Sequence, residues 1–117
     1  MIELINILFS DRQQAHIFHL KTKLYAQHVA LGDFYETILD ITDTLAETYQ
    51  GKYGILTGYE ININENTKVI EHFTTSVLQI ESNRYNWVNK NDLELQKTID
   101  DIIAEYYHLL YKLKNLQ

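Results

Sequence analysis

Apolar residues recur every three or four positions along most of the chain, which is the repeat of α-helices that bury one face. The repeat is clearest in four separate stretches. The first is carried by Ile5, Leu8, Phe9, Ile17, Leu20 and Leu24, the second by Leu31, Phe34, Ile38, Ile41, Leu45 and Tyr49, the third by Val69, Ile70, Phe73, Val77 and Ile80, and the fourth by Ile99, Ile102, Ile103, Tyr106, Leu110 and Leu113. The pattern predicts an all-α fold in which four helices of about 20–25 residues form a four-helix bundle.

Two connections between the helices can be placed from local composition. The segment from Gly51 to Asn66 holds three of the four glycines and an alternating apolar and polar stretch, Tyr59 to Ile63. That stretch is too short to form a sheet by itself, so we expect a crossover loop. The segment from Arg84 to Asn91 is rich in Asn and is expected to be a short turn. The absence of proline agrees with long, uninterrupted helices.

The boundary between the first and second helices has two candidate positions. Gly32 followed by Asp33 is typical of a helix end and a new N-cap. The other candidate is a break near Lys21 to Tyr25, where the chain has neither glycine nor proline. The residue pattern leaves both open.

Length and charge narrow the classes of protein to consider. The chain has 117 residues, so we expect residues 1–117 to form one domain. Lys and Arg number 10 against 16 Asp and Glu, a formal charge of −6, which argues against direct binding to nucleic acid or to an anionic membrane. There is no cysteine, no long apolar run and no start typical of a secretory signal. We therefore expect a cytoplasmic protein without membrane contact.

Two of the predicted helices carry unusual polar faces. The face on the second helix is acidic and consists of Glu36, Asp40, Asp43 and Glu47. The face on the first helix bears histidine and consists of Arg12, His16, His19 and Lys23. At about 100° per residue both faces are predicted to point away from the core. They are compatible with two solvated surfaces, and also with a metal ion bound where a neighbouring subunit brings the two faces together; the periodicity alone does not decide between them.

Four residues on these faces have a distinctive spacing. His16, His28, Asp43 and Glu47 form the pattern H-x11-H-x14-D-x3-E, with the last two inside Asp40-Ile41-Thr42-Asp43-Thr44-Leu45-Ala46-Glu47. This resembles the mini-ferritins of the Dps type. The resemblance implies a ferritin-like four-helix bundle with a metal site at a two-fold dimer interface. One subunit would supply His16 and His28, and the other Asp43 and Glu47.

The same resemblance implies a function and an assembly. Proteins of this family bind Fe(II), oxidise it with peroxide or oxygen, and assemble from homodimers into a dodecamer. Iron is therefore the expected metal, and the mixed imidazole and carboxylate ligands would also suit zinc or manganese. His19, Glu36 and Asp40 are further candidate ligands.

The chain departs from the family at several points. The family has an Asp four residues after the second His, and here that position is Gly32. Only 70 residues follow Glu47, too few for the extra helix of the family. The Lys-rich DNA-binding tail is also absent, so no binding to DNA is expected.

A second resemblance covers His16 to Gly54, which is similar to small tailed-bacteriophage proteins without an assigned activity. It implies a phage origin and a place in the cytoplasm of the bacterial host. The alternative function is then a non-enzymatic module that sequesters a host protein or a small signalling ligand, or a structural virion component. Two remaining pairs, Glu71-His72 and the E-x-x-H pair of Glu105 and His108, are expected to lie on the surface.

Overall fold

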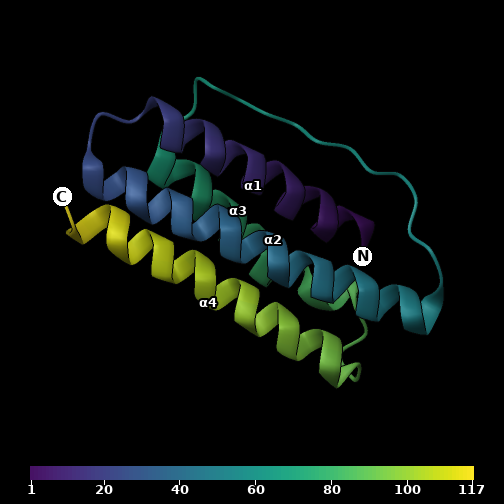
Figure 1. The fold of residues 1–117 in the computed structure, drawn as a ribbon. Coiled ribbons are helices and arrows are strands. Elements are labelled where there is room, and N and C mark those ends of the chain that lie inside the picture. Colours follow the sequence, from purple (N-terminus) through teal and green to yellow (C-terminus); the bar gives the residue numbers. More distant parts are fainter.

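The computed structural model of the protein describes all 117 residues and contains four helices, as predicted. They are α1 (Ile2–Lys21), α2 (Tyr25–Tyr53), α3 (Val69–Trp87) and α4 (Leu93–Asn115) (Figure 1). The all-α four-helix bundle is therefore confirmed. None of the helices combines the length and the apolar character that crossing a membrane requires.

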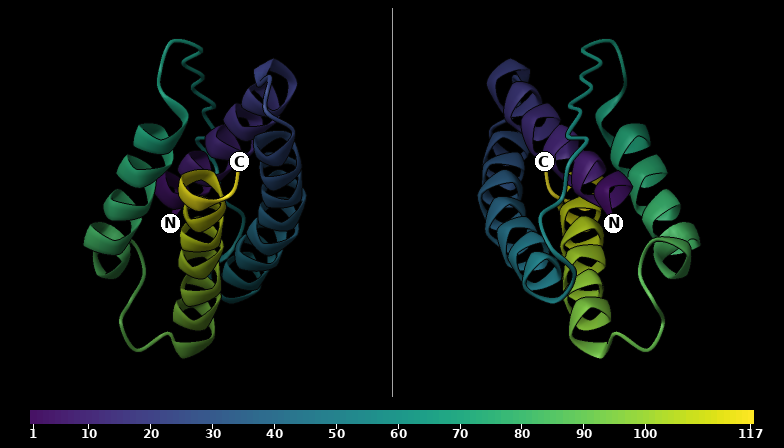
Figure 2. Two further views of the ribbon diagram at one scale, coloured as in Figure 1. Left: turned by 90° about the vertical axis from the view of Figure 1, so that its left-hand side faces the viewer. Right: turned by 90° about the vertical axis from the view of Figure 1, so that its right-hand side faces the viewer.

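The helices occupy the corners of a square in which each packs against two others (Figure 2). α1 packs on α2 and α3, and α4 packs on the same two, so α1 and α4 are diagonal partners, as are α2 and α3. Every packed pair is antiparallel, because the chain returns between α2 and α3 along the whole bundle (Figure 1). One long crossover is among the connections that four-helix bundles use.

The predicted apolar stripes meet in one core of 23 buried residues. The apolar stripe predicted for the first helix is only partly confirmed. Ile5 and Leu8 are buried, whereas Leu20 is 71% exposed and Leu24 lies beyond the end of α1. Phe18 occupies the core position at this end of α1 instead.

The break between α1 and α2 falls at residues 22–24, so the second of the two candidate boundaries is the correct one. Gly32 lies inside α2 and ends no helix. The last carbonyl groups of a helix lack partners within it. Here the Thr22 N–H bonds the Phe18 carbonyl, and the His28 ring bonds the His19 carbonyl at 2.9 Å. A side chain of α2 thus helps to end α1, and no glycine is needed.

The crossover begins and ends later than the sequence indicated. α2 continues through Tyr53, so the crossover comprises residues 54–68 in place of 51–66. Gly54 and Gly58 have φ values of 99° and 91°, a region that favours glycine. The second turn is shorter than Arg84 to Asn91, because α3 includes Arg84 and extends to Trp87.

Residues 58–64 of the crossover, here called the strap, are extended and run along α1 in the same direction (Figure 1). Three side chains of α1 accept hydrogen bonds of 2.9–3.0 Å from alternate backbone N–H groups of the strap: Asn6 from Glu60, Ser10 from Asn62, and Gln14 from Asn64. Four helical residues advance about 6.0 Å and two extended residues about 6.6 Å. Because these two repeats nearly match, successive turns of α1 bond every second residue of the strap.

Two polar clusters fix the end of the bundle opposite the α1–α2 turn. Lys52 of α2 bonds Asp92 and Glu94 at the start of α4, and the Tyr53 hydroxyl also donates to Asp92. The hydrogen bonds from Lys52 and Tyr53 lower the pKa of Asp92, and the bond from Lys52 lowers the pKa of Glu94.

Arg84 forms the second cluster, which joins α3 to α4. Its guanidinium donates to the side-chain and backbone oxygens of Gln96, both at 2.8 Å, and lies 2.7 Å from Asp100. The planar fork of the guanidinium suits this double contact.

Candidate functional site

Three of the predicted site residues meet at the contact between α1 and α2. The rings of His19 and His28 stack with centroids 3.7 Å apart, and the ring of His16 lies 6.1 Å from that of His19. Tyr35 extends the cluster by stacking on His16 at 4.3 Å. All three histidines are half-buried where the helices meet, so His16 and His19 are less exposed than the predicted outward face implied.

Hydrogen bonding fixes the position of the Nδ1 hydrogen in two of these rings. Nδ1 of His19 lies 2.6 Å from the carbonyl oxygen of His28, and Nδ1 of His28 lies 2.9 Å from the carbonyl oxygen of His19. A carbonyl oxygen only accepts, so each Nδ1 carries the hydrogen. In the neutral rings both Nε2 atoms therefore keep a free lone pair. Imidazoles that bind metals usually have this arrangement, with one nitrogen donating to a carbonyl or carboxylate.

Gly32 makes room for this cluster. A Cβ atom at position 32 would lie 3.1 Å from Cε1 and 3.2 Å from Nδ1 of His19. At such distances the ring would have to shift by a few tenths of an ångström. The His19 ring of α1 thus lies directly against Gly32 of α2.

The predicted acidic stripe on α2 is fully on the outside. Its four members are all exposed, and none of them makes an ion pair: Glu36, Asp40, Asp43 and Glu47. His28 and Asp43 are separated by 15 helical residues, about 22 Å. No group of three His, Asp or Glu side chains converges within one chain in a way that could hold a metal ion. The resemblance described above implies ligands from two subunits. The structure of a single chain therefore does not test that prediction.

A second polar cluster lies inside the bundle, and sequence reasoning missed it. The carboxylate of Asp11 on α1 is 2% exposed and accepts hydrogen bonds from His72 on α3, at 2.7 Å, and from the Tyr106 hydroxyl on α4. Burial and the neighbouring Asp11 charge raise the pKa of Tyr106 well above its ordinary range. The prediction that His72 lies on the surface is wrong, because its ring turns inward to this carboxylate.

The Asp11 cluster could have been found from one signal. Asp11 and Gln14 interrupt the apolar face of α1 formed by Leu8, Ala15 and Phe18, and a polar residue in such a position needs a buried partner. A hollow of about 220 Å³ between α1 and α3 is lined by polar groups from both helices, with the strap residue Asn62 beside it. Of the other pair set aside, His108 is exposed, as predicted, and Glu105 is half-buried.

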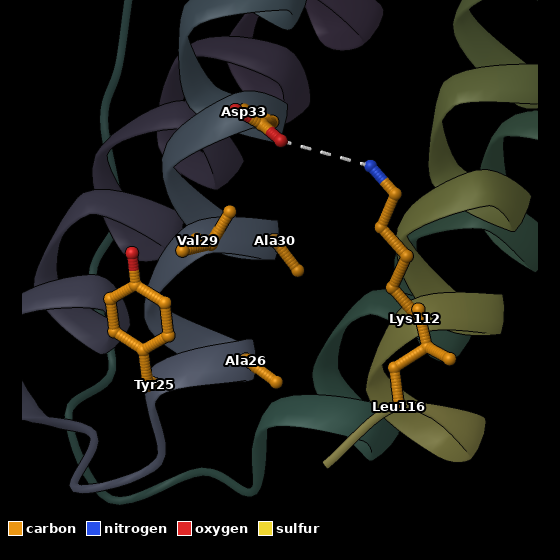
Figure 3. A pocket seen from close by; sticks show the side chains of 7 residues that line it. All are labelled: Tyr25, Ala26, Val29, Ala30, Asp33, Lys112 and Leu116. Carbon is orange, nitrogen blue, oxygen red and sulfur yellow. Dashed lines mark ion pairs between the residues drawn. The ribbon is translucent and has the colours of Figure 1, made fainter.

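An apolar hollow of about 370 Å³ opens at the α1–α2 turn, between the start of α2 and the end of α4 (Figure 3). Its lining is mostly apolar: Tyr25, Ala26, Val29, Ala30, Asp33, Lys112 and Leu116. The Lys112 ammonium and the Asp33 carboxylate lie 3.9 Å apart across its rim. Tyr25, which is 80% exposed, stands at its edge.

Comparison with known proteins identifies a family. Residues 19–113 match a family of unknown function, DUF5856, so the chain belongs to that family. The matched range includes His28, Asp43 and Glu47 but begins after His16. No curated protein and no solved structure matches the chain.

Proposed function

We propose that this member of the DUF5856 family binds Fe(II) between two copies of itself. His16 and His28 of one copy and Asp43 and Glu47 of the other are the proposed ligands, with His19 as a third imidazole. The observation that carries the proposal is the pair of hydrogen bonds that hold Nδ1 of His19 and His28 and leave each Nε2 free. Imidazole nitrogens combined with carboxylate oxygens suit Fe(II), and less selectively Zn(II) or Mn(II).

The distribution of charge around α2 supports an antiparallel arrangement of the two copies. The exposed Lys21 and Lys23 lie at the turn before α2, and the acidic stripe begins at Glu36. If the outer faces of two α2 helices pack antiparallel, the basic turn of each copy lies over the acidic stripe of the other. The same arrangement brings His28 of each copy towards Asp43 and Glu47 of its partner. Such a two-fold dimer has two equivalent metal sites.

Oxidation of the bound metal is the proposed activity. Anionic carboxylates together with imidazoles would stabilise Fe(III) relative to Fe(II). Two Fe(II) ions would each give one electron, and with two protons from solvent one molecule of peroxide would be reduced to two of water. The role of this chain is to hold the ion at Nε2 of its histidines and at the carboxylates of its partner. Gly32 contributes space for His19, which supplies a nitrogen where the mini-ferritin pattern has an oxygen.

The first experiment measures metal binding and oxidation. Anaerobic titration with Fe(II) should give one ion per chain, and aerobic Fe(II) oxidation, followed by near-ultraviolet absorbance, should exceed that in buffer. His28→Ala and Glu47→Ala should each abolish both signals. The matched controls are His108→Ala and Glu71→Ala, which remove an exposed imidazole and an exposed carboxylate outside the site. Wild-type protein that binds neither Fe(II) nor Zn(II) would refute the proposal.

A mixing experiment tests whether the ligands come from two chains. The double variants His16→Ala/His28→Ala and Asp43→Ala/Glu47→Ala should each fail to bind metal. In a mixed dimer one of the two sites is intact, so an equal mixture should recover about a quarter of the wild-type capacity. If mixed dimers form but the mixture stays inactive, the histidine pair of one chain and the carboxylate pair of the other do not form a shared site.

The apolar hollow favours one second candidate, a non-enzymatic module that binds a small ligand. Its volume is within the usual range for ligand pockets, and the ion pair of Asp33 and Lys112 offers charge at the rim. Under this alternative an apolar fluorescent dye binds the wild type, Ala26→Trp blocks the binding by filling the hollow, and Fe(II) has no effect.

A further inference from the structure

The strap presents an unpaired strand edge to the outside. In an extended chain the N–H and C=O groups of successive residues point to opposite sides. The N–H groups of Glu60, Asn62 and Asn64 point towards α1, where they bond its side chains. The N–H groups of the residues in between therefore point away from α1. These are Tyr59, Ile61 and Ile63, and none of their N–H or C=O groups has a partner within the chain.

The residues along this edge are suited to a sheet. Tyr and Ile are enriched in β-strands, and Tyr59, Ile61 and Ile63 are all exposed here. Proteins usually protect a free edge with Pro or with charged side chains, Lys above all, and residues 59–63 contain no Pro or Lys and one charged residue, Glu60. Tyr59 also stacks on Phe9 of α1, which helps to hold the strand in place.

We propose that the strap pairs with the strap of a second copy, antiparallel and about a two-fold axis at Ile61. The two edges would then form a two-stranded ribbon between the copies. A strand already ordered by three bonds to α1 loses little further freedom when it pairs.

The sequence of the strap selects this register. With the axis at Ile61, Ile61 faces its own copy and Tyr59 faces Ile63 of the second copy, so all outward N–H and C=O groups of these residues are bonded. Glu60 then faces Asn62, and no like charges are opposed. Moving the axis to residue 60 would place two Glu60 carboxylates opposite each other, which destabilises a pair of strands. Moving it to residue 62 would leave Tyr59 without an extended residue opposite, because a turn begins at Glu65.

This pairing uses a surface other than the proposed metal interface. The strap lies over α1 on the side of α3, and α2 with its acidic stripe lies on the other side of α1 (Figure 2). A chain with two self-complementary surfaces can join dimers into larger assemblies. The strap pairing can therefore be tested independently of metal binding.

Amide hydrogen exchange at two protein concentrations tests the pairing. The amides of residues 60, 62 and 64 should be protected at both concentrations by their bonds to α1. The amides of residues 59, 61 and 63 should exchange freely in dilute protein and slow by about ten-fold or more in concentrated protein. Sedimentation should show a matching shift to a larger species.

Ile61→Pro tests the same edge, because it removes the central N–H group, which the fold of one copy does not use. It should abolish both the protection and the larger species. Ile55→Pro is the matched control, since Ile55 is exposed in the same crossover but lies outside the strap. Both variants are made in the Asp43→Ala/Glu47→Ala background, so that metal bound between the copies cannot contribute.

Two results would overturn the pairing. One is exchange at residues 59, 61 and 63 that does not depend on protein concentration. The other is protection that appears only when a different extended peptide is added, because the edge would then serve another protein.

Discussion

The hydroxyl group of Tyr106 on α4 donates a hydrogen bond to the buried carboxylate of Asp11 on α1. These two helices are diagonal partners in the bundle, so the bond crosses its interior. His72 of α3 donates to the same carboxylate, which thereby ties three helices together. A buried carboxylate is costly unless hydrogen bonds satisfy it, and this requirement makes the cluster sensitive to substitution.

Tyr106→Phe should destabilise the protein by about 1–3 kcal/mol, because it leaves a buried carboxylate with one donor fewer. The ring remains, so packing in the core is largely preserved. Urea denaturation measures the free energy of unfolding. Tyr107→Phe is the control, since it removes an exposed hydroxyl that bonds Glu81 and should change stability by no more than about 0.5 kcal/mol. Equal losses in the two variants would contradict a special role for the Asp11 cluster.

Acid should weaken the end of the bundle held by Lys52. The pKa values of Asp92 and Glu94 are lowered from ordinary values of 3.8 and 4.5. A carboxylate with a lowered pKa stabilises the fold above its ordinary value and loses that contribution as pH falls through the lowered one. The free energy of unfolding should therefore decline from near pH 4.5 downwards.

Asp92→Asn separates this effect from general acid sensitivity. The variant should be less stable than the wild type at neutral pH and should lose less stability on acidification. Asp101→Asn, at an exposed position without an ion pair, should leave the pH dependence unchanged. Parallel acid profiles for the wild type and Asp92→Asn would show that the cluster does not govern the response.

Gly32→Ala should displace the His19 ring. The added Cβ would lie 3.1–3.2 Å from two ring atoms, so the bond from Nδ1 to the His28 carbonyl should weaken or break. Alanine also favours the helix by up to about 1 kcal/mol, and the net change in stability should be small. The decisive measurement is the imidazole nitrogen spectrum, in which the His19 resonances should move.

Gly51→Ala is the matched control for that experiment. Gly51 also lies in α2, but a Cβ there would meet nothing within 4 Å. It should stabilise the protein by up to about 1 kcal/mol and leave the histidine spectrum unchanged. Unchanged His19 resonances in Gly32→Ala would show that the ring does not depend on the space above Gly32.

Arg84→Lys should destabilise the contact between α3 and α4 by about 1.5–3 kcal/mol, measured by urea denaturation. The lysine keeps the charge but cannot reproduce the two bonds to Gln96. Asp100→Asn removes only the exposed ion pair of Arg84 and should cost about 0–1 kcal/mol. A larger loss in Asp100→Asn than in Arg84→Lys would assign the effect to charge and not to the fork.

The helices and most of the core could be predicted because burial of one helical face imposes a repeat of three or four residues. The end of α1 could not be predicted in this way, because the ring that caps it belongs to His28 on the next helix. Gly32 was a misleading signal for the same reason. Its role is to admit a side chain from α1, and nothing near it in the sequence indicates that contact.

The candidate site was predictable to a similar extent. The exposure of the acidic stripe followed from the helical repeat alone. The repeat could not show that His19 stacks on His28, since the pairing depends on how two helices are set against each other. The break in the apolar face of α1 at Asp11 indicates a buried polar residue, but its partners His72 and Tyr106 lie far away in the sequence and meet it only in the folded chain.

The near match between one turn of α1 and two residues of the strap limits how the crossover can change in length. One residue inserted between Glu60 and Asn62 would swap the inward and outward sides of everything after it. The N–H groups that bond Ser10 and Gln14 would then point away from α1. Two inserted residues would restore the alternation. Within this family, insertions and deletions in the strap should therefore come in pairs, whereas the flanking parts of the crossover are free of that constraint.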